Sequence, residues 1–225
     1  MPLYRQPIQQ TILDALGERV TDAENLVTAV SAQNANLLTR IAALESNLDH
    51  PGYVSGRYYQ GIQGIYTDTS SSNGLNVTGI TYVPFPVHDS VSINRLVIFC
   101  PSGITDANAT IGIYSNLNGL PHDLLISSGN LPAATAGIKE SIISLNLDRN
   151  WYWFAGITTK APALYCSGLF LGNNHIFGQT TPNTNSSSCS LRNTGTYSTL
   201  PLIAPTNNLS LLNGSAAPLF WFKVN

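Results

Sequence analysis

A heptad repeat of apolar residues runs from residue 13 to residue 48 and constrains the fold more than any other feature. The apolar residues recur in steps of three and four without a slip, and no proline interrupts them. Position a is taken by Leu13, Val20, Val27, Asn34, Ile41 and Leu48, and position d by Leu16, Ala23, Val30, Leu37 and Leu44. A 3.5-residue period keeps one seam of a helix turned toward a partner helix. The sequence therefore predicts a coiled-coil rod, about 54 Å long, formed with copies of the same chain.

The residues beside this seam favour three strands over two. Arg19 and Arg40 take position g, and each precedes a glutamate at position e, Glu24 or Glu45. An arginine stem can cover the edge of the apolar core while its guanidinium reaches a glutamate of a neighbouring helix. This arrangement resembles the short trimerisation motif of three-stranded coiled coils. Asn34 at position a argues instead for a dimer, since a buried asparagine there is best known for fixing dimers and their register.

We expect a parallel homotrimer, and the alternative is a single amphipathic helix packed on a globular domain. Apolar residues at the flanking positions, Ile12, Leu26 and Leu38, widen the seam as more than two strands require. The predicted trimerisation residues are Leu13, Leu16, Arg19, Val20, Glu24, Val27, Val30, Asn34, Leu37, Arg40, Ile41, Leu44, Glu45 and Leu48.

Composition argues against several classes of protein. The chain of 225 residues has a net charge of −2 and only 10% charged residues, so it lacks the basic face that nucleic acid requires. No stretch approaches the length of a membrane helix, and residues 1–10 carry no apolar run, so we expect neither membrane insertion nor a secretory signal. Cys100, Cys166 and Cys189 are an odd count without metal-type spacing, which favours a reducing site of synthesis and no cofactor.

The sequence divides into three parts. Residues 1–10 contain two prolines and no periodicity, so we expect an extended peptide that either plugs into another protein or is a frayed terminus. Residues 11–50 form the predicted stalk, which ends where Pro51 and Gly52 stop the helix. Residues 51–225 form the predicted head.

In the head the hydrophobic period changes from 3.5 to 2, which predicts a mainly β fold, an all-β sandwich. The expected strands are Tyr53–Tyr59, Val77–Val83, Val91–Cys100, Ala109–Tyr114, Leu124–Ser127, Lys139–Leu147, Trp151–Thr159, Ala163–Leu171 and Leu219–Val224. Two long polar segments, Thr67–Asn76 and Gln179–Thr199, are expected to be loops, and loops of this length are usually functional or mobile.

Residues 111–157 carry a pattern that is similar to a known kind of domain. Its parts are Ile111-Gly112-Ile113-Tyr114, Gly119-Leu120-Pro121, Ile126–Gly129, Ile138-Lys139-Glu140, Leu145–Leu147 and Trp151-Tyr152-Trp153. With Gly56–Tyr59 before it and Phe220–Phe222 after it, this pattern resembles the head domains of bacteriophage fibres. Such modules recur in tail fibres and capsid fibres, usually as trimeric jelly-roll heads on a stalk.

The resemblance implies a structural protein of a phage virion, synthesised in the host bacterial cytoplasm. The peptide of residues 1–10 would anchor it to other virion proteins, and the head would attach to a host cell-surface glycan or protein. The first alternative is a capsid fibre or decoration protein with a structural or weakly adhesive role. The second is a polysaccharide-cleaving enzyme, which needs paired carboxylates. The head's carboxylates are few and lie apart in the sequence, so we expect no enzymatic activity: Asp68, Asp89, Asp106, Asp123, Glu140 and Asp148.

The sequence names five candidate receptor-binding residues. Arg192 and Tyr197 are the large polar groups of the segment Gln179–Thr199, and a charged donor beside a stacking ring suits a sugar. Asn173, Asn174 and His175 are the other candidates, although for His175 the sequence favours closing a turn over facing a ligand. The alternative for the whole segment is a surface loop without a ligand, or one that packs on an adjacent subunit.

Aromatic residues at two places in the head are assigned to packing instead of binding. Strand alternation sends Trp151 and Trp153 to one face and Tyr152 and Phe154 to the other, a pattern typical of a strand buried on both sides. Phe220–Phe222 are likewise expected in the core and in the trimer interface.

Overall fold

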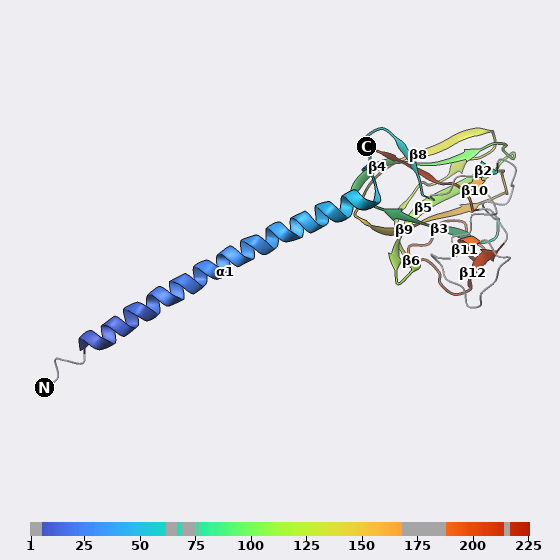
Figure 1. The fold of residues 1–225 in the computed structure, drawn as a ribbon. Coiled ribbons are helices and arrows are strands. Elements are labelled where there is room, and N and C mark those ends of the chain that lie inside the picture. The colour runs from blue at the N-terminus through green and yellow to red at the C-terminus, as the bar shows by residue number, and fades with distance from the viewer. Residues whose placement is uncertain (1–5, 62–66, 69–74, 76, 168–187, 214–216) are drawn as a thin grey trace. The chain divides into compact units, whose positions relative to one another are not determined.

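The computed structural model describes residues 6–61, 67–68, 75, 77–167, 188–213 and 217–225, with the backbone alone described at 6–8, 44–49, 67–68, 167, 188–189 and 213. The chain divides into two compact units, residues 1–51 and residues 52–225. The first contains one helix, and the second is built from β-strands (Figure 1). The division lies at Pro51, where the sequence predicts the end of the stalk.

The helix α1 spans Gln6–Asp49, 44 residues. It begins earlier than predicted, so the expectation that residues 6–10 are extended is wrong. Pro7 stands in the first turn, where a backbone N–H has no acceptor within the helix, and a proline is tolerated there. The helix ends at Asp49 because Pro51 disfavours helical geometry in the residue before it. Over the described residues, no helix combines the length and hydropathy that a membrane span needs.

The second unit contains two antiparallel sheets and a small strand pair. One sheet has the order β1 (Tyr58–Gln60), β13 (Trp221–Val224), β4 (Val91–Cys100) and β8 (Gly137–Leu147). The other has the order β12 (Leu209–Asn213), β11 (Ser188–Asn193), β3 (Ile80–Val87), β9 (Asn150–Thr158), β5 (Asn108–Leu117) and β6 (Leu120–Ser127), with β7 (Leu131–Pro132) beside β5. The pair is β10 (Cys166–Ser167) with β2 (Thr67–Asp68).

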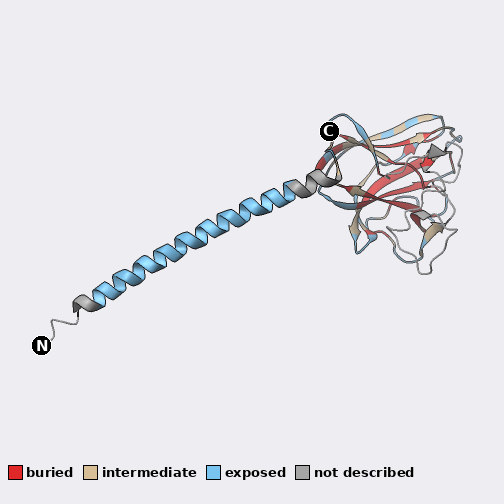
Figure 2. Ribbon diagram, viewed as in Figure 1, coloured by how far each residue is buried: buried red, intermediate tan, exposed pale blue. Residues whose placement is uncertain are grey.

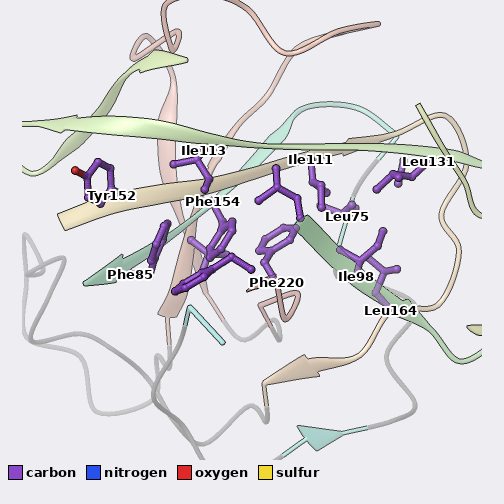
Figure 3. Packing of buried hydrophobic residues seen from close by; sticks show 14 of the residues in the cluster. Leu75, Phe85, Ile98, Ile111, Ile113, Leu131, Tyr152, Phe154, Leu164 and Phe220 are labelled. Atoms are coloured by element: carbon purple, nitrogen blue, oxygen red, sulfur yellow. The ribbon is translucent and has the colours of Figure 1, made fainter. Parts of the chain in front are cut away.

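The main core is shared by the two sheets. The smaller sheet contributes residues such as Ile98 and Phe222, and the larger sheet contributes Phe85, Ile111 and Phe154. The aromatic rings stack closely, with the centroids of Phe85 and Phe154 4.1 Å apart. Figure 3 shows Phe85, Phe154 and Phe220 gathered beside Ile111 and Ile113 of β5. A mainly β head with two sheets around one core is therefore as the sequence predicts.

A second apolar cluster lies on the other face of the larger sheet. Tyr82, Tyr114 and Trp153 belong to it, and Leu200 and Ala204 from the segment after β11 pack with them. Both faces of β9 are thus covered, as its aromatic residues predict, except that Trp151 at the start of the strand is exposed. Phe220 and Phe222 lie in the main core, and Trp221 between them does not.

One β-bulge changes which side chains of β4 face the core. Against β13 the register of β4 shifts, because the consecutive residues Lys223 and Val224 pair with Arg95 and Ile93, so β4 has one extra residue there. A shift of one residue moves every later side chain to the opposite face. Leu96 and Ile98 are therefore fully buried in the core, and Phe99 is only partly buried.

Several strand predictions are corrected. The first predicted strand begins only at Tyr58, and the described part of Ala163–Leu171 contains only the two-residue β10. The segment Gln179–Thr199 is not one loop, because its residues 188–193 form β11, which pairs with both β3 and β12. Thr67–Asp68 of the other predicted loop form β2. Strand β12 is not predicted at all.

Candidate functional site

The heptad seam of α1 is open to solvent on the single chain. Every side chain from residue 9 to residue 43 is exposed, including Leu13 at 60% and Val27 at 65% (Figure 2). The predicted members Leu44, Glu45 and Leu48 lie on the helix, but their side chains are outside the described residues. Apolar side chains in such a continuous stripe are normally covered by protein.

The polar residues off the seam satisfy their hydrogen bonds within the helix itself. The hydroxyls of Thr21, Thr28, Ser31 and Thr39 each donate to the carbonyl oxygen four residues earlier, at 2.8–3.0 Å. All four residues lie outside positions a and d. These four hydroxyls therefore make their hydrogen bonds without a neighbouring molecule.

Tyr197, a predicted receptor contact, is part of the head's packing. Its ring lies against the second apolar cluster, and its hydroxyl donates a 2.6 Å hydrogen bond to Oδ1 of Asn193. The amide nitrogen of Asn193 in turn donates to the carbonyl oxygens of Pro205 and Asn207. Tyr197 thus helps to hold the segment after β11, and its hydroxyl already has a partner.

Arg192 lies on the opposite face of β11. Leu191 and Asn193 face the second cluster, so alternation turns Arg192 toward the side of Thr81, its register partner on β3. Arg192 and Tyr197 therefore do not form the single binding surface that the sequence suggested. Arg192 is half-buried, and removal from water lowers the pKa of its guanidinium.

Polar atoms without partners gather around Arg192. Within the described part of the chain, Nε of Arg192, Oγ of Ser190 and Oγ1 of Thr81 are buried and have no hydrogen-bond partner. Thr81 of β3 lies opposite Arg192, and Ser190 precedes Arg192 by two residues on β11. Buried donors and acceptors without partners cost free energy, so this face can gain stability from a polar ligand. Asn173, Asn174 and His175 lie outside the described residues.

The charged groups of the head are dispersed in pairs. His122 Nδ1 lies 2.9 Å from Asp123 Oδ2, and Lys160 Nζ lies 3.6 Å from Asp106 Oδ2, all with exposed side chains. In the described part of the chain, no group of three or more His, Cys, Asp or Glu side chains is placed to hold a metal ion.

The structure reveals a further surface feature that the sequence analysis missed. A hollow of about 240 Å³ lies on the smaller sheet and is lined by Tyr58, Val97, Phe99, Ile138, Tyr165 and Trp221. We call the side of this sheet that carries these residues the outer face. Trp221 of β13 pairs with Val97 of β4, and Phe99 pairs with Ile138 of β8.

Two features of the sequence place apolar residues around the hollow. Only the first can be recognised from the sequence alone. Ile138 and Ile142 stand at alternate positions of β8 where a solvent-facing strand would carry polar residues. Val97 and Phe99 reach this face only because the bulge in β4, seen in its pairing with β13, reverses the alternation. Without the bulge, strict alternation from Val91 would place the side chains of Val97 and Phe99 in the core.

Comparison with known proteins identifies no relative. No protein-family model matches the chain, and a search of curated proteins gives no significant match. The function must therefore be argued from the geometry.

Proposed function

We propose that this chain is a fibre protein of a bacteriophage virion, a parallel homotrimer with a coiled-coil stalk and a jelly-roll head. The residues before the stalk anchor the fibre to other virion proteins. The head attaches to a glycan or protein on the host surface. The carrying observation is the continuous exposed apolar seam of α1, 44 residues long, in a chain whose remaining residues form a separate β unit.

The seam supports self-association on energetic grounds. Burying one Val, Leu or Ile side chain contributes about 1.5–3 kcal/mol. Seven such side chains at positions a and d are exposed on each chain: Leu13, Leu16, Val20, Val27, Val30, Leu37 and Ile41. The strict heptad period directs them to helices wound around the same axis. Arg19 with Glu24, and Arg40 with Glu45, favour three chains over two.

The strand order of the head supports the jelly-roll assignment. In a jelly roll, eight strands numbered along the chain form two sheets in the orders 1-8-3-6 and 2-7-4-5. Eight strands of the head match this scheme when they are numbered 1 to 8 along the chain: β1, β3, β4, β5, β6, β8, β9 and β13. They form the orders β1-β13-β4-β8 and β3-β9-β5-β6. Strands β11 and β12 extend the second sheet, and β2, β7 and β10 are short additions.

Attachment through the head is consistent with the trimer. Three copies of one weak site engage a surface together, and the avidity can exceed the single-site affinity by about 10²–10⁴. Arg192 is the best candidate contact, because its Nε and the hydroxyls of Ser190 and Thr81 lack partners among the described residues. Polar groups of this kind suit the hydroxyls of a sugar.

Light scattering coupled to size exclusion tests the proposal on the full chain. The expected mass is three times the chain mass of 24.1 kDa. Val30→Asp puts a charge at position d and should give monomers. Ala29→Asp is the matched control, since Ala29 is an exposed neighbour outside the seam, and this variant should stay trimeric. A dimer, or equal effects of the two variants, would contradict the proposed stalk. Labelled antibody on intact phage particles then tests the virion location.

A further inference from the structure

We propose that the outer face of the smaller sheet is the surface through which the heads of one trimer pack on one another. The occupant of the hollow is therefore a second copy of this chain. This inference rests on the proposed trimer and goes beyond it, because a coiled coil alone holds three chains together without any contact between heads.

The first argument is the apolar character of the outer face. Ile138 is 64% exposed and Ile142 is 76% exposed on the single chain, and Tyr58 is also exposed. Tyr58 and Ile138 line a hollow whose six described lining residues include no charged side chain, and Ile142 lies on the same side of β8 beyond Glu140. Phe99 and Tyr165 stack in it, with ring centroids 4.5 Å apart. Clustered aliphatic and aromatic side chains on a sheet are typical of a protein–protein contact.

The second argument is the sign of the charges around the hollow. Arg95 Nε lies 3.5 Å from Glu140 Oε1, and the hydroxyl of Tyr58 donates to Glu140 Oε2 at 3.3 Å. Lys223 Nζ lies 5.2 Å from the centroid of the Tyr58 ring. The cations Arg95 and Lys223 and the anion Glu140 therefore lie close together on this face. A face of mixed sign can meet a copy of itself, whereas a face of single sign would repel the copy.

The third argument is the tether. Eight residues, 50–57, separate the end of α1 from β1, the first strand of this sheet. On a trimeric stalk, a link this short gives the three heads an effective concentration in about the millimolar range. A contact too weak to join free heads can therefore form within the trimer. A sugar ligand is less suited to the hollow, because among the described lining residues only Tyr58, Tyr165 and Trp221 offer polar groups, two hydroxyls and an indole N–H.

Hydroxyl-radical oxidation of the full-length trimer, read by mass spectrometry at Trp221, tests this inference. The stalk variant Val30→Asp leaves every head residue unchanged. If it separates the chains, oxidation of Trp221 should rise several-fold. Trp151, which is 40% exposed and lies outside the outer face, should react equally in both proteins. Ala29→Asp should match the wild type.

A second variant changes the face and leaves the stalk intact. Ile138→Glu with Ile142→Glu should remain trimeric by light scattering while oxidation of Trp221 rises several-fold. Leu202→Glu with Ile203→Glu is the control, because both residues are exposed aliphatics outside the hollow, and Trp221 should stay protected in it. Equal oxidation of Trp221 in the wild-type trimer and in both test variants would overturn the inference and leave the stalk standing. A wild-type chain that is not trimeric would overturn the proposed function and this inference together.

Discussion

The rings of Tyr82 and Tyr114 meet edge to face in the second apolar cluster, with centroids 5.6 Å apart and planes at 79°. Both side chains are fully buried, but their hydroxyls differ. Tyr114 donates a 2.7 Å hydrogen bond to the carbonyl oxygen of Pro201, whereas the hydroxyl of Tyr82 has no partner among the described residues. Two chemically identical neighbours thus make opposite contributions to stability.

Replacing each tyrosine by phenylalanine should therefore give opposite results. Tyr82→Phe removes a buried hydroxyl without a hydrogen bond and should raise the free energy of unfolding by about 1 kcal/mol. Tyr114→Phe leaves the Pro201 carbonyl unpaired and should lower it by about 1 kcal/mol. Urea denaturation of the two full-length variants, followed by near-UV circular dichroism of the head, measures both. A loss of stability in Tyr82→Phe would mean that its hydroxyl has a partner in the folded protein.

The same two residues predict a loss of stability at alkaline pH. Burial raises the pKa of both hydroxyls well above the ordinary value of 10, and for Tyr82 the neighbouring Tyr114 and Tyr197 add to this effect. The folded state therefore keeps these protons while the unfolded state loses them above pH 10. Stability from these groups is intact below pH 10 and falls as the pH rises further. Urea titrations between pH 8 and 11 should show this decline, with a shallower slope in Tyr82→Phe, and an equal slope would contradict the assignment.

Asn34 offers a test of the seam by substitution. Its amide stands at position a, where an aliphatic side chain stabilises a coiled coil more. Asn34→Ile should raise the melting temperature of the helical signal at 222 nm by several degrees in the full chain. Asn36→Ile is the matched control, because Asn36 lies outside the seam, and it should produce no such rise. Equal shifts in the two variants would place the seam on another face of the helix.

Arg192 is the residue through which receptor attachment is best tested. Arg192→Ala should reduce binding of the labelled full chain to host bacterial cells at least tenfold, with a change of only a few degrees in melting temperature. Arg57→Ala, which removes an exposed arginine elsewhere in the head, should bind as the wild type. Tyr197→Ala is unsuitable, because loss of its packed ring and its bond to Asn193 should destabilise the head. Normal binding by Arg192→Ala would remove this residue from the site.

The sequence predicts the parts of this fold that depend on local periodicity. Val91–Cys100 matches β4 at both ends because its flanking turns and its β-branched residues agree. The strand β11 escapes prediction because its residues are mostly small and polar, and it is a strand through pairing with β3 and β12. The bulge in β4 also escapes, because nothing local distinguishes Asn94 from its neighbours. That one residue decides whether Val97 and Phe99 face the core or the hollow.

The candidate site is predictable only in part for the same reason. The heptad seam is a local pattern of the sequence. The exposure of its apolar side chains along one face of the helix follows from that pattern. The separation of Arg192 from Tyr197 is not a local pattern, because it depends on the pairing of β11, which turns Arg192 away from the second cluster, and on the packing of Tyr197, beyond that strand, against the cluster.

The first and last strands of the head lie side by side. Tyr58 of β1 pairs with Lys223 of β13, and the backbone nitrogen of Gly56 donates to the carbonyl oxygen of Val224. The first and last strands of the unit therefore meet at one place, and the residues of the core lie between them in the sequence. A domain whose two ends meet can be joined to a different protein at a single junction, and none of its internal loops has to change. Gene fragments that encode such a unit can therefore recombine through that junction, and the folded unit is transferred whole.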